Sequence, residues 1–199
     1  MEFEGKCIIF SAPSGAGKTT IVRYLLKKVK NLEFSVSATS RAKRDYEVDG
    51  HDYHFLSVTD FKNHIEKDKF IEWEEVYADN YYGTLKSEIE RIWSEEKHVI
   101  FDVDVMGGIK LKSIFGEKAL SIFVQPPSIQ ELENRLIGRG SETPETIIRR
   151  VGKAEKEMKS AKEFDYILIN DKLEEAKKEA RRTVLNFFEG KELDDDVEE

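Results

Sequence analysis

The sequence predicts an α/β fold in which a doubly wound parallel sheet forms the core, with a small mixed-β insertion and a helical lid. Short apolar runs alternate with helical patterns along the chain, as expected when helices cover both faces of a parallel sheet. Two segments, residues 35–97 and 128–153, interrupt this alternation. A chain of 199 residues, 39% of them hydrophobic, is long enough to bury one core that carries such excursions.

Four apolar runs are strand candidates: residues 7–10, 99–105, 120–124 and 166–169. They are continuous rather than alternating, which favours strands that are buried on both faces. Two stripes of apolar residues with helical periodicity predict one helix between these strands and one after them. The first consists of Ile21, Val22, Leu25, Leu26 and Val29, and the second of Leu173, Ala176, Ala180, Val184 and Phe187.

The predicted core comprises residues 1–34, 98–127 and 154–190. Residues 35–97 are rich in Tyr, Phe, Asp and Lys in short alternating runs, which predicts a mainly β insertion that ends in a helix over residues 86–96. Residues 128–153 are helical in pattern around the turn GRGSETP, and we expect them to form a mobile lid. Residues 191–199 form an acidic tail, which we expect to be solvated.

Charge, cysteine content and hydropathy indicate which partners and which compartment to expect. Residues 192–199 contribute six acidic residues and no basic one to the formal net charge of −8, so the rest of the chain is nearly neutral and we expect no nucleic-acid partner. The single cysteine, Cys7, lies in an apolar run, which favours a buried thiol in a reducing compartment. No stretch approaches the roughly 18 apolar residues of a membrane span, so we expect a cytoplasmic protein without a membrane partner. The oligomeric state stays open.

A glycine-rich turn follows the first apolar run. Gly15 and Gly17 precede Lys18 and Thr19 in the stretch SAPSGAGKTT, which has the spacing of a phosphate-binding loop. Backbone N–H groups and the positive end of the following helix dipole suit a nucleoside triphosphate. Lys18 would reach its β- and γ-phosphates, and the Thr19 hydroxyl would ligate Mg²⁺. The predicted triphosphate-binding residues are Ala12, Pro13, Ser14, Gly15, Ala16, Gly17, Lys18, Thr19 and Thr20.

Ala12 stands where this loop pattern has its first glycine. Because Ala12 precedes Pro13, we expect an extended backbone with negative φ, where a Cβ costs little, and an intact loop. A strand-to-helix turn that merely needs small residues would explain the glycines, but not Lys18 and Thr19. GTPases, ATPases and small-molecule kinases share such a loop, so it identifies only the phosphate donor.

The insertion provides residues suited to a phosphorylated acceptor. Within TSRAKRDYEVDGHDYHF, Arg41 and Arg44 lie three positions apart, close enough to bind one phosphate together, and Tyr53 adds a hydroxyl donor. These residues predict a monophosphate site. The four histidines (His51, His54, His64 and His98) have no metal-ligand spacing, so we expect ordinary structural roles for them.

The segment TSRAKRDYEVDGHDYHF and the phosphate-binding loop together resemble the guanylate kinase family, with similarity from residue 6 to about residue 188. The resemblance implies transfer of the ATP γ-phosphate to GMP by a P-loop core, with a GMP-binding insertion and an arginine-bearing lid. It places Ser37, Glu72, Thr84 and Asp104 around guanine, and Arg41, Arg44, Tyr53 and Tyr82 around the GMP phosphate. It also implies that Arg135, Arg139 and Arg150 clamp the phosphates and that Asn170 lies beside adenine. The implied catalytic residues are Lys18, Arg41, Arg135, Arg139 and Arg150.

The chain departs from the family pattern at one point. It has one more residue between Trp73 and Tyr81 than that pattern, at Ala78 or Asp79, so Tyr81 is the alternative to Tyr82 at the GMP phosphate. Two further interpretations follow from residue chemistry. One carboxylate, Glu72, can accept from both N1–H and the 2-amino group of guanine. Asp102 ends an apolar strand beside the phosphate-binding loop, where an acid contacts the waters of Mg²⁺ or the substrate.

Ordinary roles compete with some of these assignments. Glu72 could be a surface acid on a strand, the arginines could be helix-surface charges, and for Arg149 we favour the surface role. Two functional classes stay open beside the enzyme. One is a guanylate-kinase-like module that binds a protein partner, although such modules characteristically lose the phosphate-binding loop. The other is a kinase for a different phosphorylated acceptor.

Overall fold

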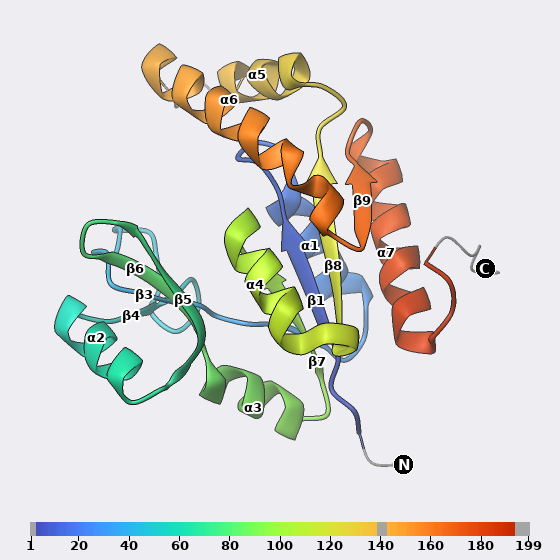
Figure 1. Ribbon diagram of the computed structural model, residues 1–199. Coiled ribbons are helices and arrows are strands. Elements are labelled where there is room, and N and C mark those ends of the chain that lie inside the picture. Colours follow the sequence, from blue (N-terminus) through green and yellow to red (C-terminus); the bar gives the residue numbers. More distant parts are fainter. Residues whose placement is uncertain (1–2, 139–142, 194–199) are drawn as a thin grey trace. The chain divides into compact units, whose positions relative to one another are not determined.

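The computed structural model describes residues 3–138 and 143–193 (Figure 1). It divides into two compact units. The insertion unit consists of residues 33–99 with the first residues of the chain, and the core unit consists of residues 6–32 and 100–199. The predicted Arg139 and the acidic residues from Asp194 onward lie outside the described residues.

Most of a five-stranded sheet belongs to the core unit, and the division between the two units falls within β2 and β7. The strand order of this sheet is β2-β7-β1-β8-β9, and the strands span Leu32–Phe34, His98–Asp102, Cys7–Ser11, Ala119–Gln125 and Tyr166–Ile169. Strands β1 and β8 pair in parallel, with Phe10 opposite Ile122, and β8 and β9 pair in parallel as well. Because both faces are covered, β1 is buried at every position. The predicted α/β fold with a parallel sheet is confirmed.

Three helices cover this sheet. Figure 1 shows α4 (Val105–Phe115) in front of β1 and β8 and α1 (Lys18–Lys28) behind them, and α1 packs against α7 (Leu173–Glu189). A Cβ at Gly108 of α4 would lie 2.3 Å from the Ser11 hydroxyl, so this helix approaches β1 at glycine distance. Short 3-10 turns at Gly116–Lys118 and Ala161–Glu163 follow α4 and α6.

Two further helices of the core unit, α5 (Ile129–Gly138) and α6 (Pro144–Lys159), contain most of the segment predicted as a lid. They pack through Leu132, Leu136, Ile147 and Ala154. The α6 N-terminus follows the usual chemistry, because the Thr143 hydroxyl accepts from the Thr146 N–H and Pro144 occupies the first turn. Helix α6 continues to Lys159, six residues beyond the predicted end of the segment.

The insertion unit contains a mixed four-stranded sheet of order β4-β3-β6-β5. These strands span His54–Phe55, Ala38–Thr39, Asn80–Leu85 and Phe70–Tyr77, and helices α2 (Val58–Glu66) and α3 (Lys86–Ser94) accompany them. Strand β3 pairs in parallel with β4 and antiparallel with β6, which is also antiparallel to β5. The predicted mixed-β character is confirmed, and the predicted helix over residues 86–96 ends two residues earlier.

Stacked aromatic side chains form the core of the insertion unit. The Phe61 ring stacks on Phe70 at 4.4 Å between centroids and on Tyr81 at 5.4 Å. Ala38 joins this buried cluster. Such contacts bury a large apolar area in a small sheet. They stabilise the strands that contain predicted site residues.

One strand prediction was wrong. The apolar run over residues 99–105 predicted a strand as far as Val105, but β7 ends at Asp102 and α4 begins at Val105. The Asp104 carboxylate accepts a 2.8 Å hydrogen bond from the Gly107 N–H, so it caps α4. The N-capping preference of aspartate outweighs the β propensity of the valines beside it.

The structure shows the environment of the single cysteine and the length and apolarity of the helices. Cys7 is fully buried in β1, so the prediction of a buried thiol is confirmed, and burial raises the pKa of this thiol to about 12. In the described part of the chain, no helix is both long and apolar enough to cross a bilayer.

Candidate active site

The phosphate-binding loop connects β1 to α1 in the core unit. Gly15 and Gly17 have φ values of 101° and 95°, a region that favours glycine. The loop turns through a 3.1 Å hydrogen bond from the Ala16 N–H to the Pro13 carbonyl. The first turn of α1 contains no acidic residue, and no side chain caps this described helix. Its N-terminal N–H groups and dipole therefore favour an anion.

Ala12 does not disturb this loop. The described non-glycine residues with positive φ are Asn31, Asp68, Asp79 and Glu96, so the backbone at Ala12 lies outside the left-handed region, as its place before Pro13 predicted. A Cβ is therefore tolerated at the position where the general pattern has a glycine.

The Asp102 carboxylate contacts the side chains of both Lys18 and Thr19. It lies 2.5 Å from Lys18 Nζ, and the Thr19 hydroxyl donates to it over 2.9 Å. Lys18 also donates to the Val103 carbonyl over 2.5 Å. Asp102 stands at the end of β7, so the sheet fixes this carboxylate beside the loop. An ammonium, a hydroxyl and a carboxylate converge at the helix N-terminus, which is the arrangement needed around a phosphate–metal complex.

The donor set near the loop suits Mg²⁺. The Thr19 hydroxyl and the Asp102 carboxylate are hard oxygen ligands, and Mg²⁺ is commonly held by one or two such groups together with water and substrate phosphates. Within residues 3–138 and 143–193, no three His, Cys, Asp or Glu side chains cluster as metal ligands. Thr19 and Asp102 therefore fit a Mg²⁺ ion that also keeps water and phosphate oxygens as ligands.

Two of the predicted lid arginines belong to the described residues. The Arg150 guanidinium of α6 donates a hydrogen bond to the Ser14 hydroxyl in the phosphate-binding loop. Arg135 of α5 pairs with Glu131 at 2.9 Å and donates to the Asp171 carbonyl over 3.3 Å. Arg150 thus lies against the loop, whereas Arg135 lies against the turn after β9.

Asn170 begins that turn and contacts the loop directly. It is 3% exposed, and its Nδ2 donates a 2.7 Å hydrogen bond to the Ala16 carbonyl. Its Oδ1 is buried and accepts no hydrogen bond from the residues that the structure describes. The family resemblance implies that Asn170 lies beside adenine. In the structure, its amide nitrogen donates to a carbonyl of the phosphate-binding loop.

In the insertion unit, Arg41 is held by an acidic partner. Its guanidinium donates to the two Glu47 carboxylate oxygens over 2.7 and 2.5 Å, and the Arg44 N–H donates to the same carboxylate over 2.8 Å. These hydrogen bonds, Arg41 foremost, outweigh burial and lower the pKa of Glu47 to about 2. The Arg41 guanidinium lies 5.1 Å from the centroid of the Tyr53 ring. A rigid cation beside an aromatic hydroxyl is suited to bind a phosphate.

The structure distinguishes the two adjacent tyrosines of β6. Tyr81 is 6% exposed and stacks in the aromatic core, whereas the Tyr82 ring meets Tyr53 edge-on at 5.9 Å. After its hydrogen bond to Glu47, the contact with Tyr82 helps to raise the pKa of Arg41 above its ordinary value. Alternation along the strand places only Tyr82 on the face of Arg41 and Tyr53. Ala78 and Asp79, the positions at which we expected the extra residue, form the β5–β6 turn, and Asp79 has a φ of 59° there.

Glu72 and Thr84 form a buried polar pair on β5 and β6. They lie opposite each other in the ladder, and the Thr84 hydroxyl donates to Glu72 Oε1 over 2.8 Å. Glu72 is 7% exposed and Thr84 is fully buried. The sequence left open a surface acid at position 72, and the burial of this carboxylate contradicts that alternative.

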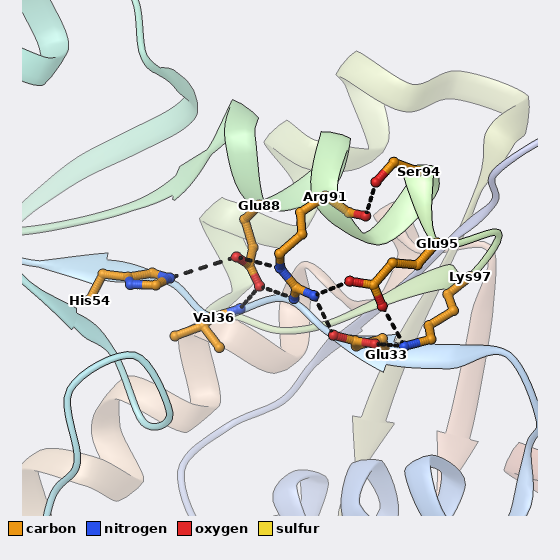
Figure 2. A network of polar contacts seen from close by, with 8 residues as sticks. All are labelled: Glu33, Val36, His54, Glu88, Arg91, Ser94, Glu95 and Lys97. Carbon is orange, nitrogen blue, oxygen red and sulfur yellow. Dashed lines mark hydrogen bonds and ion pairs between the residues drawn. The ribbon is translucent and has the colours of Figure 1, made fainter.

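Ser37 is the remaining predicted guanine contact, and its neighbours are held on both sides. Its carbonyl accepts from the His54 N–H over 2.9 Å, and the preceding Val36 N–H donates to the buried Glu88 carboxylate over 3.4 Å. Figure 2 shows Glu88 at the centre of a polar network from α3 and the strand before Ser37. Arg91 donates to Glu88 over 2.8 Å and to Glu33 over 2.7 Å. The sequence predicted neither Glu88 nor the role of Glu47.

The predicted residues thus fall into two groups, and each group is coherent within its own unit. The core unit brings together Lys18, Thr19, Asp102, Arg150 and Asn170 around the phosphate-binding loop. The insertion unit brings together Arg41, Tyr53 and Tyr82, and separately Glu72 and Thr84. Asp104 belongs to the core unit, where its carboxylate caps α4, and Arg44 donates from its guanidinium to the Tyr46 hydroxyl over 2.9 Å. Fold and loop define a P-loop protein of the nucleotide-binding type.

Comparisons with known proteins identify the family. The guanylate kinase family model matches residues 4–186. A guanylate kinase from Bacteroides fragilis is 52% identical over 93% of this chain and 91% of its own length, and one from Porphyromonas gingivalis is 52% identical over 92% and 98%. The crystal structure of a guanylate kinase from Anaplasma phagocytophilum matches 97% of this chain and 90% of that chain with a TM-score of 0.75 at 26% identity. The chain belongs to the guanylate kinase family, as its sequence signature predicted.

Proposed function

We propose that the protein transfers the γ-phosphate of ATP to GMP, which yields ADP and GDP. Its curated relatives bear the name guanylate kinase over nearly their whole length. One observation supports this assignment most strongly. A buried carboxylate, Glu72 of β5, lies in the same unit as the cluster of Arg41, Tyr53 and Tyr82, and β5 pairs with β6, the strand that contains Tyr82. The carboxylate is suited to recognise a base, and the cluster of Arg41 and the two tyrosines is suited to recognise a monophosphate.

Guanine chemistry explains why a carboxylate is suited to this position. N1–H and the 2-amino group lie side by side, and the two oxygens of Glu72 can accept from both. Adenine has a lone pair at N1 and no 2-amino group, so it would offer this buried carboxylate neither of the two donors and would place a lone pair against it, at considerable cost. The Thr84 hydroxyl bonds to Oε1 of this carboxylate and so fixes its orientation. Ser37 and Asp104 are the other proposed guanine contacts.

Phosphoryl transfer requires positioning and charge neutralisation rather than a covalent nucleophile. Lys18 and the N–H groups of the phosphate-binding loop would hold the ATP phosphates, and Arg135, Arg139 and Arg150 would add positive charge from the lid. Arg41, Arg44, Tyr53 and Tyr82 would hold the GMP phosphate. Bound Mg²⁺ neutralises the phosphate oxygens. Thr19 would bind it directly and Asp102 through water. We assign no general base.

A coupled assay of ADP release tests this function. The purified protein is supplied with ATP, Mg²⁺ and one of GMP, AMP, UMP or CMP, and Lys18→Ala serves as the control for contaminating kinases. We expect turnover with GMP to exceed turnover with each other acceptor by at least tenfold. Preference for another monophosphate would favour the kinase of a different acceptor. Nucleotide binding without ADP release from any acceptor would favour a protein-binding module.

A further inference from the structure

Asn170 lies where the sheet of the core unit meets the phosphate-binding loop. Its own N–H donates a 2.8 Å hydrogen bond to the Gln125 carbonyl, which continues the parallel pairing of β8 with β9 by one residue. The position of Asn170 is therefore set by the buried sheet. Its side chain then reaches Ala16, which is 154 residues away in the sequence, over 2.7 Å.

The bonded atom determines what Asn170 can do. The Ala16 carbonyl belongs to the same peptide unit as the Gly17 N–H, and in a planar trans peptide the C=O and N–H point in opposite directions. A bond that holds the Ala16 carbonyl toward Asn170 therefore directs the Gly17 N–H to the opposite side. This peptide needs such a restraint, because Gly15 and Gly17 flank Ala16 with positive φ and glycine moves easily between backbone regions.

The fit between Asn170 and the loop is close. A Cβ on Gly17 would lie 2.4 Å from Asn170 Nδ2, so a larger residue at position 17 would displace the amide as well as strain the backbone. Glycine at this position is thus required by two independent features, its φ and its contact with Asn170.

We propose that Asn170 is a positioning residue that orients the Ala16–Gly17 peptide so that the loop binds a triphosphate, whichever base that triphosphate carries. This inference rests on the proposed ATP site and goes beyond it, because the family resemblance implied only a contact with adenine. The two roles differ in their chemistry. A contact with adenine affects nucleotides alone, whereas orientation of the loop also affects a triphosphate without a base.

Calorimetric titration with the magnesium complexes of ATP and of inorganic tripolyphosphate separates the two roles. We expect Asn170→Ala to weaken the binding of both ligands by on the order of tenfold, because a buried carbonyl loses its donor. Asn170→Asp should weaken both at least as much, since it turns an oxygen toward the Ala16 carbonyl. GMP affinity should stay within twofold of the wild-type value, which checks that the variants are folded.

Asn186→Ala is the matched control. Asn186 is also a fully buried asparagine whose Nδ2 donates to a backbone carbonyl, that of Glu192, over 3.0 Å. Its replacement should lower the melting temperature and leave both triphosphate affinities within twofold. Unchanged binding of tripolyphosphate by Asn170→Ala would overturn the inference, whatever happens to ATP. A wild-type protein that binds neither triphosphate would instead contradict the proposed function itself.

Discussion

The Arg41 guanidinium and the Glu47 carboxylate form a two-point ion pair, with N–O distances of 2.7 and 2.5 Å. Both Glu47 oxygens are occupied, and Oε2 also accepts from the Arg44 N–H. This geometry matches the planar fork of arginine. It fixes the guanidinium that we assign to the GMP phosphate, so the seven residues from Arg41 to Glu47 are held around one carboxylate.

The depressed pKa of Glu47 has a consequence for stability. Because the Arg41 hydrogen bond lowers this pKa from 4.5 to about 2, the ionised carboxylate favours the folded state. Its stabilising contribution is complete above about pH 4.5 and is lost as the pH falls toward 2. We expect Glu47→Gln to melt at a lower temperature than wild type at neutral pH, with a difference that shrinks between these two values. A difference that is constant from pH 6 to pH 3 would contradict this linkage.

The two tyrosines of β6 offer a matched pair of substitutions. Tyr82→Phe removes the hydroxyl that faces Arg41 and the proposed phosphate, so we expect the KM for GMP to rise about fivefold or more. Tyr81→Phe alters a residue of the aromatic core and should leave this KM within twofold. Steady-state kinetics at saturating ATP decides between them. Equal effects of the two substitutions, or a larger effect of Tyr81→Phe, would contradict the assignment of Tyr82.

The polar network of α3 predicts where the insertion unit is sensitive. Glu88→Ala removes the acceptor of the Val36 N–H and the buried partner of Arg91, and we expect a loss of about 1 to 2 kcal/mol in the free energy of unfolding. Glu95→Ala removes a 42% exposed partner of the same arginine and should cost less than about 0.5 kcal/mol. Urea denaturation measures both. Similar costs for the two variants would show that the burial of Glu88 adds nothing.

Lys18 is the group whose loss should affect chemistry most. Its ammonium contacts the Asp102 carboxylate and the Val103 carbonyl in the core unit, whereas the proposed GMP phosphate and Glu72 sites belong to the insertion unit. We expect Lys18→Ala to lower kcat by on the order of 10³, as for the loss of other groups that stabilise transition-state charge, while the Kd for GMP stays within threefold. Turnover within tenfold of wild type would refute the assigned role.

Some of these features were predictable because their chemistry requires fixed spacing along the chain. The phosphate-binding loop is of this kind. The end of β7 was predicted wrongly because the apolar run continues past Asp102, and only the helix that follows reveals that Asp104 is its N-cap. The choice between Tyr81 and Tyr82 depended on how the β5–β6 turn accommodates one residue, which is a matter of backbone geometry at Asp79.

Other features could not be predicted from local pattern at all. Glu88 meets Val36 from 52 residues away, and Asn170 meets Ala16 from 154 residues away. Such pairs depend on which elements pack together, and no spacing in the sequence records that. The role of Glu47 had a partial signal, since it stands at a fixed position in the TSRAKRDYE segment, but its bond to Arg41 required the fold of the loop.

The recognition of guanine by Glu72 is tested most directly by comparing GMP with inosine monophosphate, which retains N1–H and lacks the 2-amino group. For the wild-type enzyme, kcat/KM should be on the order of 10- to 100-fold higher for GMP, because the inosine nucleotide leaves one Glu72 oxygen without its donor. Glu72→Gln should lower kcat/KM for GMP by on the order of 10²-fold and reduce this preference to a few-fold, with the KM for ATP nearly unchanged. If Glu72→Gln retains both the GMP efficiency and the preference over inosine monophosphate, then Glu72 does not read the base.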